Sequence, residues 1–109
     1  MLITTQIIVF INKKFASGVI INDSLDFAVK YQTNKIFGNL PHMLRALLAD
    51  HAFEDGNKRT AAFILINYFE ENNMVFSEER ISKIIRRIAQ THPSSIEKIR
   101  SMIKYAIQS

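Results

Sequence analysis

The sequence TAAFILINYF, residues 60–69, decides the fold, because it is apolar at every position except Thr60 and Asn67. A stretch of this kind predicts a helix that is hydrophobic nearly all round. Such a helix is buried among other helices. We therefore expect residues 60–69 to form the central element of the molecule.

Shorter amphipathic patterns precede and follow this central helix. Helices are expected over residues 3–15, 25–31, 40–50, 60–69, 78–90 and 95–106. Ser77 is the expected cap of the fifth helix, and Ser94 forms a capping-box pattern with Glu97 at the start of the sixth. The β-branched residues of the first segment also permit a strand. Residues 32–39 indicate a loop or a small hairpin.

The chain length limits how these elements are organised. With 109 residues, the chain is shorter than the roughly 150 residues of an average domain, so we expect one domain over residues 1–109. The predicted fold is all-α, a compact bundle of about five or six helices around the central hydrophobic helix, with a short flap hairpin as an optional addition.

The composition excludes some chemistry and leaves the choice of partner open. The absence of cysteine excludes disulfide scaffolds, thiolate zinc sites and thiol catalysis. The net charge is +4, and it is concentrated at the end of the chain: residues 80–109 carry seven Lys and Arg residues against Glu97 alone. This excess suggests an acidic partner, nucleic acid, or merely a solvated face.

Apolar runs in this chain are too short to span a bilayer, which requires roughly 18 consecutive apolar residues. The run Ile7 to Ile11 is also too short for a signal-peptide core. We therefore expect a cytoplasmic protein with no membrane partner.

The link between the two most hydrophobic helices carries a cluster of polar residues, His-Ala-Phe-Glu-Asp-Gly-Asn-Lys-Arg at 51–59. A glycine-containing loop that enters a helix N-terminus is a natural anion cradle, and Lys58 and Arg59 add two positive charges there. Asp55 suits a divalent cation that bridges to phosphate oxygens. His51 can accept a proton near neutral pH. Together these groups indicate phosphoryl or nucleotidyl transfer.

Each residue of this cluster also has a structural interpretation. A single histidine at a helix end is often a capping or core residue, as we expect for His42 and His92. Asp-Gly-Asn is a common turn, and Lys-Arg at a helix start usually faces solvent. Packing alone does not require a base, a carboxylate and two cations in one link, so their co-occurrence favours a phosphate site.

The stretch HAFEDGNKRTA, residues 51–61, resembles the signature loop of the Fic/Doc superfamily, His-x-Phe-x-(Asp/Glu)-Gly-Asn-x-Arg. It is most similar to the death-on-curing (Doc) toxin branch. The all-helical surroundings agree with a Doc-like core, and the resemblance extends from about Thr4 to Ile107.

The resemblance implies a role for each position of the loop. His51 would be the general base that takes the proton from a target hydroxyl. Phe53 would anchor the loop in the core, and Asp55 would bind Mg²⁺. The phosphates of the co-substrate ATP would be held by Gly56 and Asn57, which form the anion hole, and by Lys58 and Arg59.

The resemblance also implies a flap before the signature helix that aligns the target segment by backbone pairing. The best candidate is the stretch Lys35, Ile36, Phe37 and Gly38.

Two departures from the pattern bear on which group is transferred. AMP-transferring Fic enzymes usually have glycine at the place of Lys58, and a second arginine where this chain has Ala62. Both differences favour Doc, in which a lysine goes with phosphate transfer, whereas Gly56 is the Fic-like choice. We prefer a protein kinase activity and keep protein AMP transfer (AMPylation) as the alternative.

Regulation and partners follow from the same resemblance. The inhibitory pattern (Ser/Thr)-x-x-x-Glu-(Gly/Asn) is missing from the 109 residues, because Asn67 precedes Glu71 where a Ser or Thr is needed. We therefore expect inhibition by another chain, such as the antitoxin of a toxin–antitoxin pair. The target would be a protein, in the best-known case of the family a translation elongation factor.

A third hypothesis is a catalytically silent binding module that uses the basic helices at the end of the chain to bind nucleic acid or the acidic tail of an antitoxin. Basic residues on one helix face are more often solvated surface, and no aromatic residue interleaves Arg80 to Arg87 as single-strand binding would favour. We therefore do not expect nucleic acid as a partner. The oligomeric state stays open.

Overall fold

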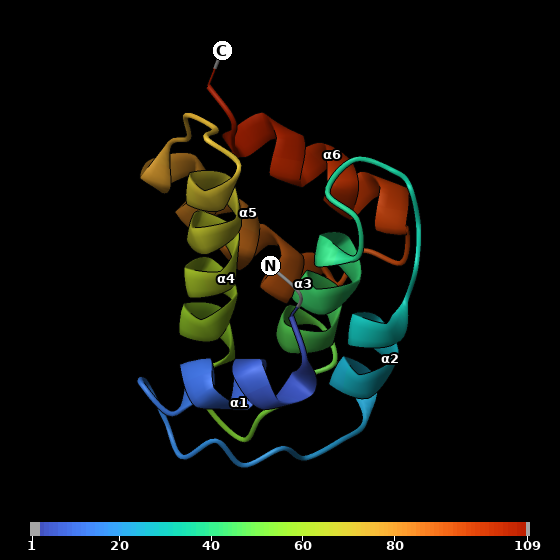
Figure 1. The fold of residues 1–109 in the computed structure, drawn as a ribbon, viewed down its shortest axis with the longest axis vertical. Coiled ribbons are helices and arrows are strands. Elements are labelled where there is room, and N and C mark those ends of the chain that lie inside the picture. The colour runs from blue at the N-terminus through green and yellow to red at the C-terminus, as the bar shows by residue number, and fades with distance from the viewer. Residues whose placement is uncertain (1–2, 109) are drawn as a thin grey trace.

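The computed structural model describes residues 3–108, which form helices packed against one another without a sheet in that range (Figure 1). The helices are α1 (Thr5–Asn12), α2 (Ser24–Lys30), α3 (Leu40–Leu48), α4 (Asn57–Glu71), α5 (Glu78–Thr91) and α6 (Ile96–Ala106). The all-α class and the number of helices are as predicted. The first segment is a helix rather than the strand that its β-branched residues also permitted.

Side-chain hydrogen bonds cap α1, α5 and α6, whereas Asp23 and Asn39, the N-cap residues of α2 and α3, form none. The Thr4 side chain accepts a hydrogen bond from Ile7 N, and the Ser77 side chain accepts one from Arg80 N. At α6 the prediction was one residue off: Ser95, not Ser94, is the N-cap and accepts from Lys98 N. Either serine can supply the same hydroxyl, so sequence alone did not distinguish them.

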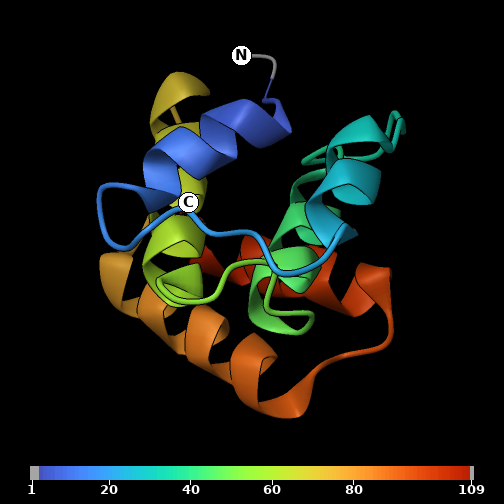
Figure 2. The same ribbon diagram turned by 90° about the horizontal axis from the view of Figure 1, so that it is seen from below.

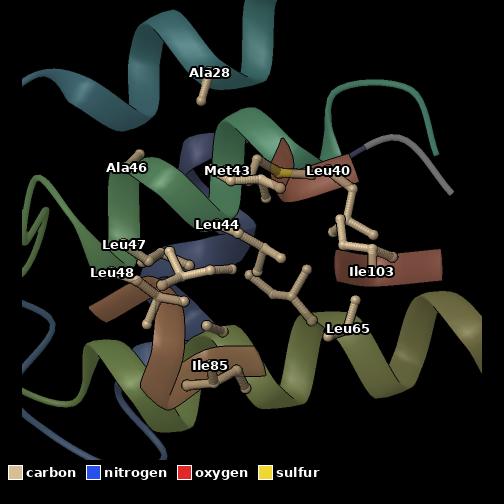
Figure 3. Packing of buried hydrophobic residues seen from close by; sticks show 14 of the residues in the cluster. Ala28, Leu40, Met43, Leu44, Ala46, Leu47, Leu48, Leu65, Ile85 and Ile103 are labelled. Carbon is tan, nitrogen blue, oxygen red and sulfur yellow. The ribbon is translucent and has the colours of Figure 1, made fainter. Parts of the chain in front are cut away.

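Helix α3 shares the centre of the molecule with α4. Seven of the nine residues of α3 are buried, and the helix packs against α2, α4, α5 and α6. Figure 3 shows side chains of α3, such as Leu44 and Leu47, directed towards Leu65 of α4 and Ile85 of α5. Helix α4 packs against α1, α3 and α5, but Phe63 on its outer side is 38% exposed. The core therefore has two central helices rather than α4 alone.

Residues 31–39 connect α2 to α3 as a loop, which is one of the two forms expected for this segment. The Phe37 side chain is buried and its backbone is left-handed. The Arg100 guanidinium of α6 donates to the carbonyls of Ile36 and Gly38, and Lys35 pairs with Glu97 at 2.9 Å. The turn is thus fastened to α6 and forms no hairpin.

No helix within residues 3–108 is both long enough and apolar enough to cross a bilayer.

Candidate active site

The loop from α3 to α4 lies beside the segment that connects α1 to α2 (Figure 2). The two segments pair like short antiparallel strands: Ile21 N donates to Ala52 O at 2.9 Å, and Glu54 N donates to Val19 O at 2.9 Å. This pairing was not predicted from the sequence. Because β-pairing depends on which segments meet in space, no local sequence pattern predicts it.

Asn57 and Phe53 close the loop on itself. Phe53 N donates to Asn57 Oδ1 at 3.0 Å, and Asn57 Nδ2 donates to Phe53 O at 2.9 Å. The Phe53 side chain is 1% exposed and belongs to the core, as its role of anchor implies. Because the side chain of Asn57 is engaged in this closure, the donor that Asn57 can offer to a phosphate is its backbone N–H.

Gly56 occupies a position that only glycine fits. Its φ is +78°, in the left-handed region, and it is the N-cap of α4. A Cβ atom there would lie 3.0 Å from the Ala16 Cβ and 3.0 Å from Asn12 Nδ2. Strain and crowding therefore both exclude a side chain at the start of α4.

Asn12 of α1 is a site residue that the sequence did not reveal. Its side chain is fully buried and makes three hydrogen bonds. Nδ2 donates to Asp55 O at 2.9 Å and to Thr60 Oγ1 at 3.1 Å, while Oδ1 accepts from Gly18 N at 2.9 Å. Asn12 therefore connects both loops to α4. A single asparagine near the end of an amphipathic helix gives no signal of this role.

His51 lies at the beginning of the loop with an exposed side chain and a left-handed φ of +52°. Asn22 Nδ2 donates to the carbonyls of Asp50 and His51, at 2.8 and 3.3 Å, and fixes the backbone there. The His51 ring meets the His92 ring edge-on, with 6.1 Å between ring centroids. His92 caps the end of α5, in agreement with the structural role expected for it.

The exposed and partly exposed residues of the loop from α3 to α4 line one pocket of about 410 Å³. Its lining comprises Phe15, Leu47, Leu48, His51, Glu54, Asp55, Gly56, Asn57, Lys58, Arg59 and Ala89. The predicted base, carboxylate, glycine and cations therefore share one cavity. The flap candidate, residues 35–38, is not part of this lining, since it lies before α3 whereas the site loop follows α3.

A larger pocket of about 680 Å³ lies between α2 and α3. Its lining includes Tyr31 and His42, whose rings stack with centroids 3.8 Å apart, but none of residues 51–59. Size alone does not identify the chemistry, and the smaller pocket holds the functional groups.

The carboxylates suit a cation that arrives with phosphate. Asp55 is exposed at the pocket, and its Oδ1 accepts from Gly56 N at 2.8 Å. Glu54 lines the same pocket, yet no group of three or more His, Asp and Glu side chains within residues 3–108 could enclose a metal ion. One or two carboxylates beside a phosphate cradle fit Mg²⁺, which keeps waters and takes substrate oxygens as ligands.

Comparisons of the chain with models of known families, with curated proteins and with solved structures found no match. The function therefore has to be inferred from the pocket itself.

Proposed function

We propose that this protein is an enzyme that transfers a phosphoryl group from ATP to a hydroxyl group of a target protein. The observation that carries the proposal is the pocket of about 410 Å³ whose lining includes His51, Asp55 and the cationic start of α4. A base, a carboxylate and a phosphate cradle are the parts that phosphoryl transfer needs, because positioning and charge stabilisation supply most of its rate.

The start of α4 would hold the phosphates. The first turn of a helix has backbone N–H groups without intrahelical partners and carries a partial positive charge. Gly56 at this end lines the pocket, and the exposed side chains of Lys58 and Arg59 line the same pocket. Arginine can hold a phosphate through two parallel hydrogen bonds, while lysine acts as a point charge.

His51 would act as the general base. It would take the proton of the target hydroxyl as the new oxygen–phosphorus bond forms and the bond from the γ-phosphorus to the bridging oxygen breaks, so that ADP leaves. Asp55 would hold Mg²⁺, which when bound neutralises phosphate charge and supports the leaving group. The fixed backbone of residues 50–51, held by Asn22, would keep the His51 ring at the mouth of the pocket.

The residues at positions 58 and 62 support phosphoryl transfer over AMP transfer. Lys58 is exposed and lines the pocket, which places a cation next to the start of α4. Ala62, one turn into α4, carries no charge with which to clamp a distal phosphate. Transfer of AMP from the same pocket remains the second outcome of the test below.

The biological setting would follow the resemblance of residues 51–61 to the Fic/Doc superfamily. The enzyme would then be a Doc-like toxin that works in the cytoplasm. Its target would be a protein, with a translation elongation factor as the example from the family. An antitoxin chain would restrain it, because the pattern of an internal inhibitory helix is missing from the 109 residues.

The test is to incubate the protein and Mg²⁺ with a cell lysate and ATP labelled at either the α or the γ phosphate. Protein-bound label from γ-labelled ATP alone is the expected result. Label from α-labelled ATP would replace this proposal with AMP transfer, and no label from either would reject a transferase. Lys58→Ala should reduce the labelling at least about tenfold, whereas Lys104→Ala, outside the pocket, should leave it unchanged.

A further inference from the structure

A second concave surface lies on the outer side of α5 and α6, the orange and red helices of Figure 2, which pack against each other. Two adjoining pockets of about 400 and 340 Å³ make up this groove, which we call the α5/α6 groove. Its lining comprises Lys83, Ile84, Arg86, Arg87, Gln90, Lys98, Ser101, Met102 and Tyr105. None of these residues lines the pocket around His51.

The cations of the α5/α6 groove are mostly uncompensated. Within residues 3–108, Arg86, Arg87 and Lys98 form no ion pair, and Lys83 has only the exposed Glu79 at 3.4 Å. Glu97 is engaged elsewhere, by Lys35 and Arg100, and the lysine lowers the pKa of its carboxyl through a hydrogen bond. The groove therefore presents a concentrated positive field to solvent.

The floor of the α5/α6 groove is apolar. The buried Ile84, the partly buried Met102 and the half-exposed Tyr105 line the groove together with the cations. The Arg80 guanidinium covers the Tyr105 ring at 4.7 Å and donates to Tyr105 O at 3.1 Å, which holds Tyr105 in place. An aromatic side chain thus adjoins the basic residues of α5, although none lies among residues 80–87, because it comes from α6.

We propose that the α5/α6 groove binds an acidic segment of a partner protein that carries an apolar side chain. Carboxylates of the segment would meet Lys83, Arg87 and Lys98, and its apolar side chain would enter between Ile84 and Met102. Lys83, Arg87 and Gln90 follow one face of α5 over about 10 Å, enough for three or four residues of an extended peptide.

Nucleic acid fits this groove less well. Single-stranded nucleic acid uses a succession of aromatic platforms, one for each stacked base. The α5/α6 groove has one aromatic ring, and Arg80 already lies over it. An aliphatic floor between cations suits a leucine flanked by carboxylates better than it suits bases.

Binding can be measured by fluorescence anisotropy with three labelled probes: a short glutamate peptide with one central leucine, the all-glutamate peptide, and an oligothymidylate of equal charge. The leucine peptide should bind most tightly, and its affinity should fall with added salt. The variant K83E/R87E should raise its Kd about tenfold or more, while K14E/K30E, with the same net charge, should change it less than about twofold. Tyr105→Ser should weaken the leucine peptide more than the all-glutamate peptide.

Three results would overturn the proposal. Tightest binding of oligothymidylate would assign the groove to nucleic acid. An equal loss of peptide affinity in K83E/R87E and K14E/K30E would show that binding depends only on the overall charge of the protein. No binding of any probe by the wild type would leave the groove as solvated surface. Circular dichroism of each variant establishes that the helices persist. Because no groove residue lines the His51 pocket, this result is independent of the transferase assay.

Discussion

Gly56 and Asn12 show how single residues shape the start of α4. Gly56 is recognisable in the sequence, because glycine before a basic helix start is typical of an anion cradle. Asn12 is not, because its partners Asp55 and Thr60 lie 43 and 48 positions away along the chain. A short motif can reveal the residues that face the ligand, whereas the residues that hold the motif in place become visible only in the fold.

Gly56→Ala should destabilise the protein more than Gly38→Ala does. Both glycines have positive φ, at +78° and +55°, but a Cβ at Gly56 meets two atoms at 3.0 Å whereas a Cβ at Gly38 meets nothing within 4 Å. The backbone cost, about 1 kcal/mol, is common to both, and crowding adds about 1–3 kcal/mol at Gly56. Urea unfolding of the two variants measures the difference. Equal losses would show that the loop relaxes around the new methyl group.

Asn12→Ala should lower the free energy of unfolding by about 1–3 kcal/mol, because the buried Thr60 Oγ1 and the partly buried Gly18 N and Asp55 O lose their partner. The exposed Asn34 provides the matched control, and Asn34→Ala should change stability by less than about 0.5 kcal/mol. Chemical denaturation gives both values. A loss at position 12 no larger than at position 34 would remove Asn12 from the scaffold of the site.

Among the elements, α3 and the loop before it differ most from expectation. The sequence pattern shows that both α3 and α4 are hydrophobic but not how many neighbours each has, and α3 proved to be the more enclosed. The flap candidate also depends on a distant element, since Arg100 of α6 holds the turn at Ile36 and Gly38. The periodicity of apolar residues predicts the helices well, but it does not predict which elements pack against each other.

The environment of His42, where α2 packs against α3, predicts that the stability of the fold depends on pH. Burial and the neighbouring Arg45 and Arg100 lower the pKa of His42 below its ordinary value of 6.5. The unfolded chain then binds this proton more readily than the folded one, so stability is full above about pH 6.5 and declines as the pH falls through the folded pKa. Glu97, whose pKa is also lowered, affects stability only at more acidic pH.

His42→Gln should remove part of this dependence. We expect the urea midpoint of the wild type to fall between pH 7.5 and pH 5.5, and that of the variant to fall less. The variant will be less stable at pH 7.5, because it loses the stacking of His42 on Tyr31. If the urea midpoints of the two proteins fell equally between pH 7.5 and pH 5.5, the pH effect could not be assigned to His42.

At the scale of the molecule, the helices form two separate concave surfaces, the pocket around His51 and the α5/α6 groove. Residues of α3, α4 and the loop between them line the pocket around His51, together with Phe15 after α1 and Ala89 of α5, whereas other residues of α5 and α6 form the basic groove. Sequence analysis located both cationic regions and the all-α class. The apolar residues that line the pocket, such as Phe15 and Ala89, could not be predicted, because nothing in the sequence distinguishes them from other apolar residues.

The most direct test of the central claim compares His51→Ala with His42→Ala in the assay with γ-labelled ATP. His51 lines the pocket at the phosphate cradle, whereas His42 belongs to the other cavity. Loss of the base should lower transfer by about 100-fold or more, without loss of Mg·ATP binding or of helical structure. His42→Ala should keep the wild-type rate at pH 7.5. Undiminished transfer by His51→Ala would contradict the account.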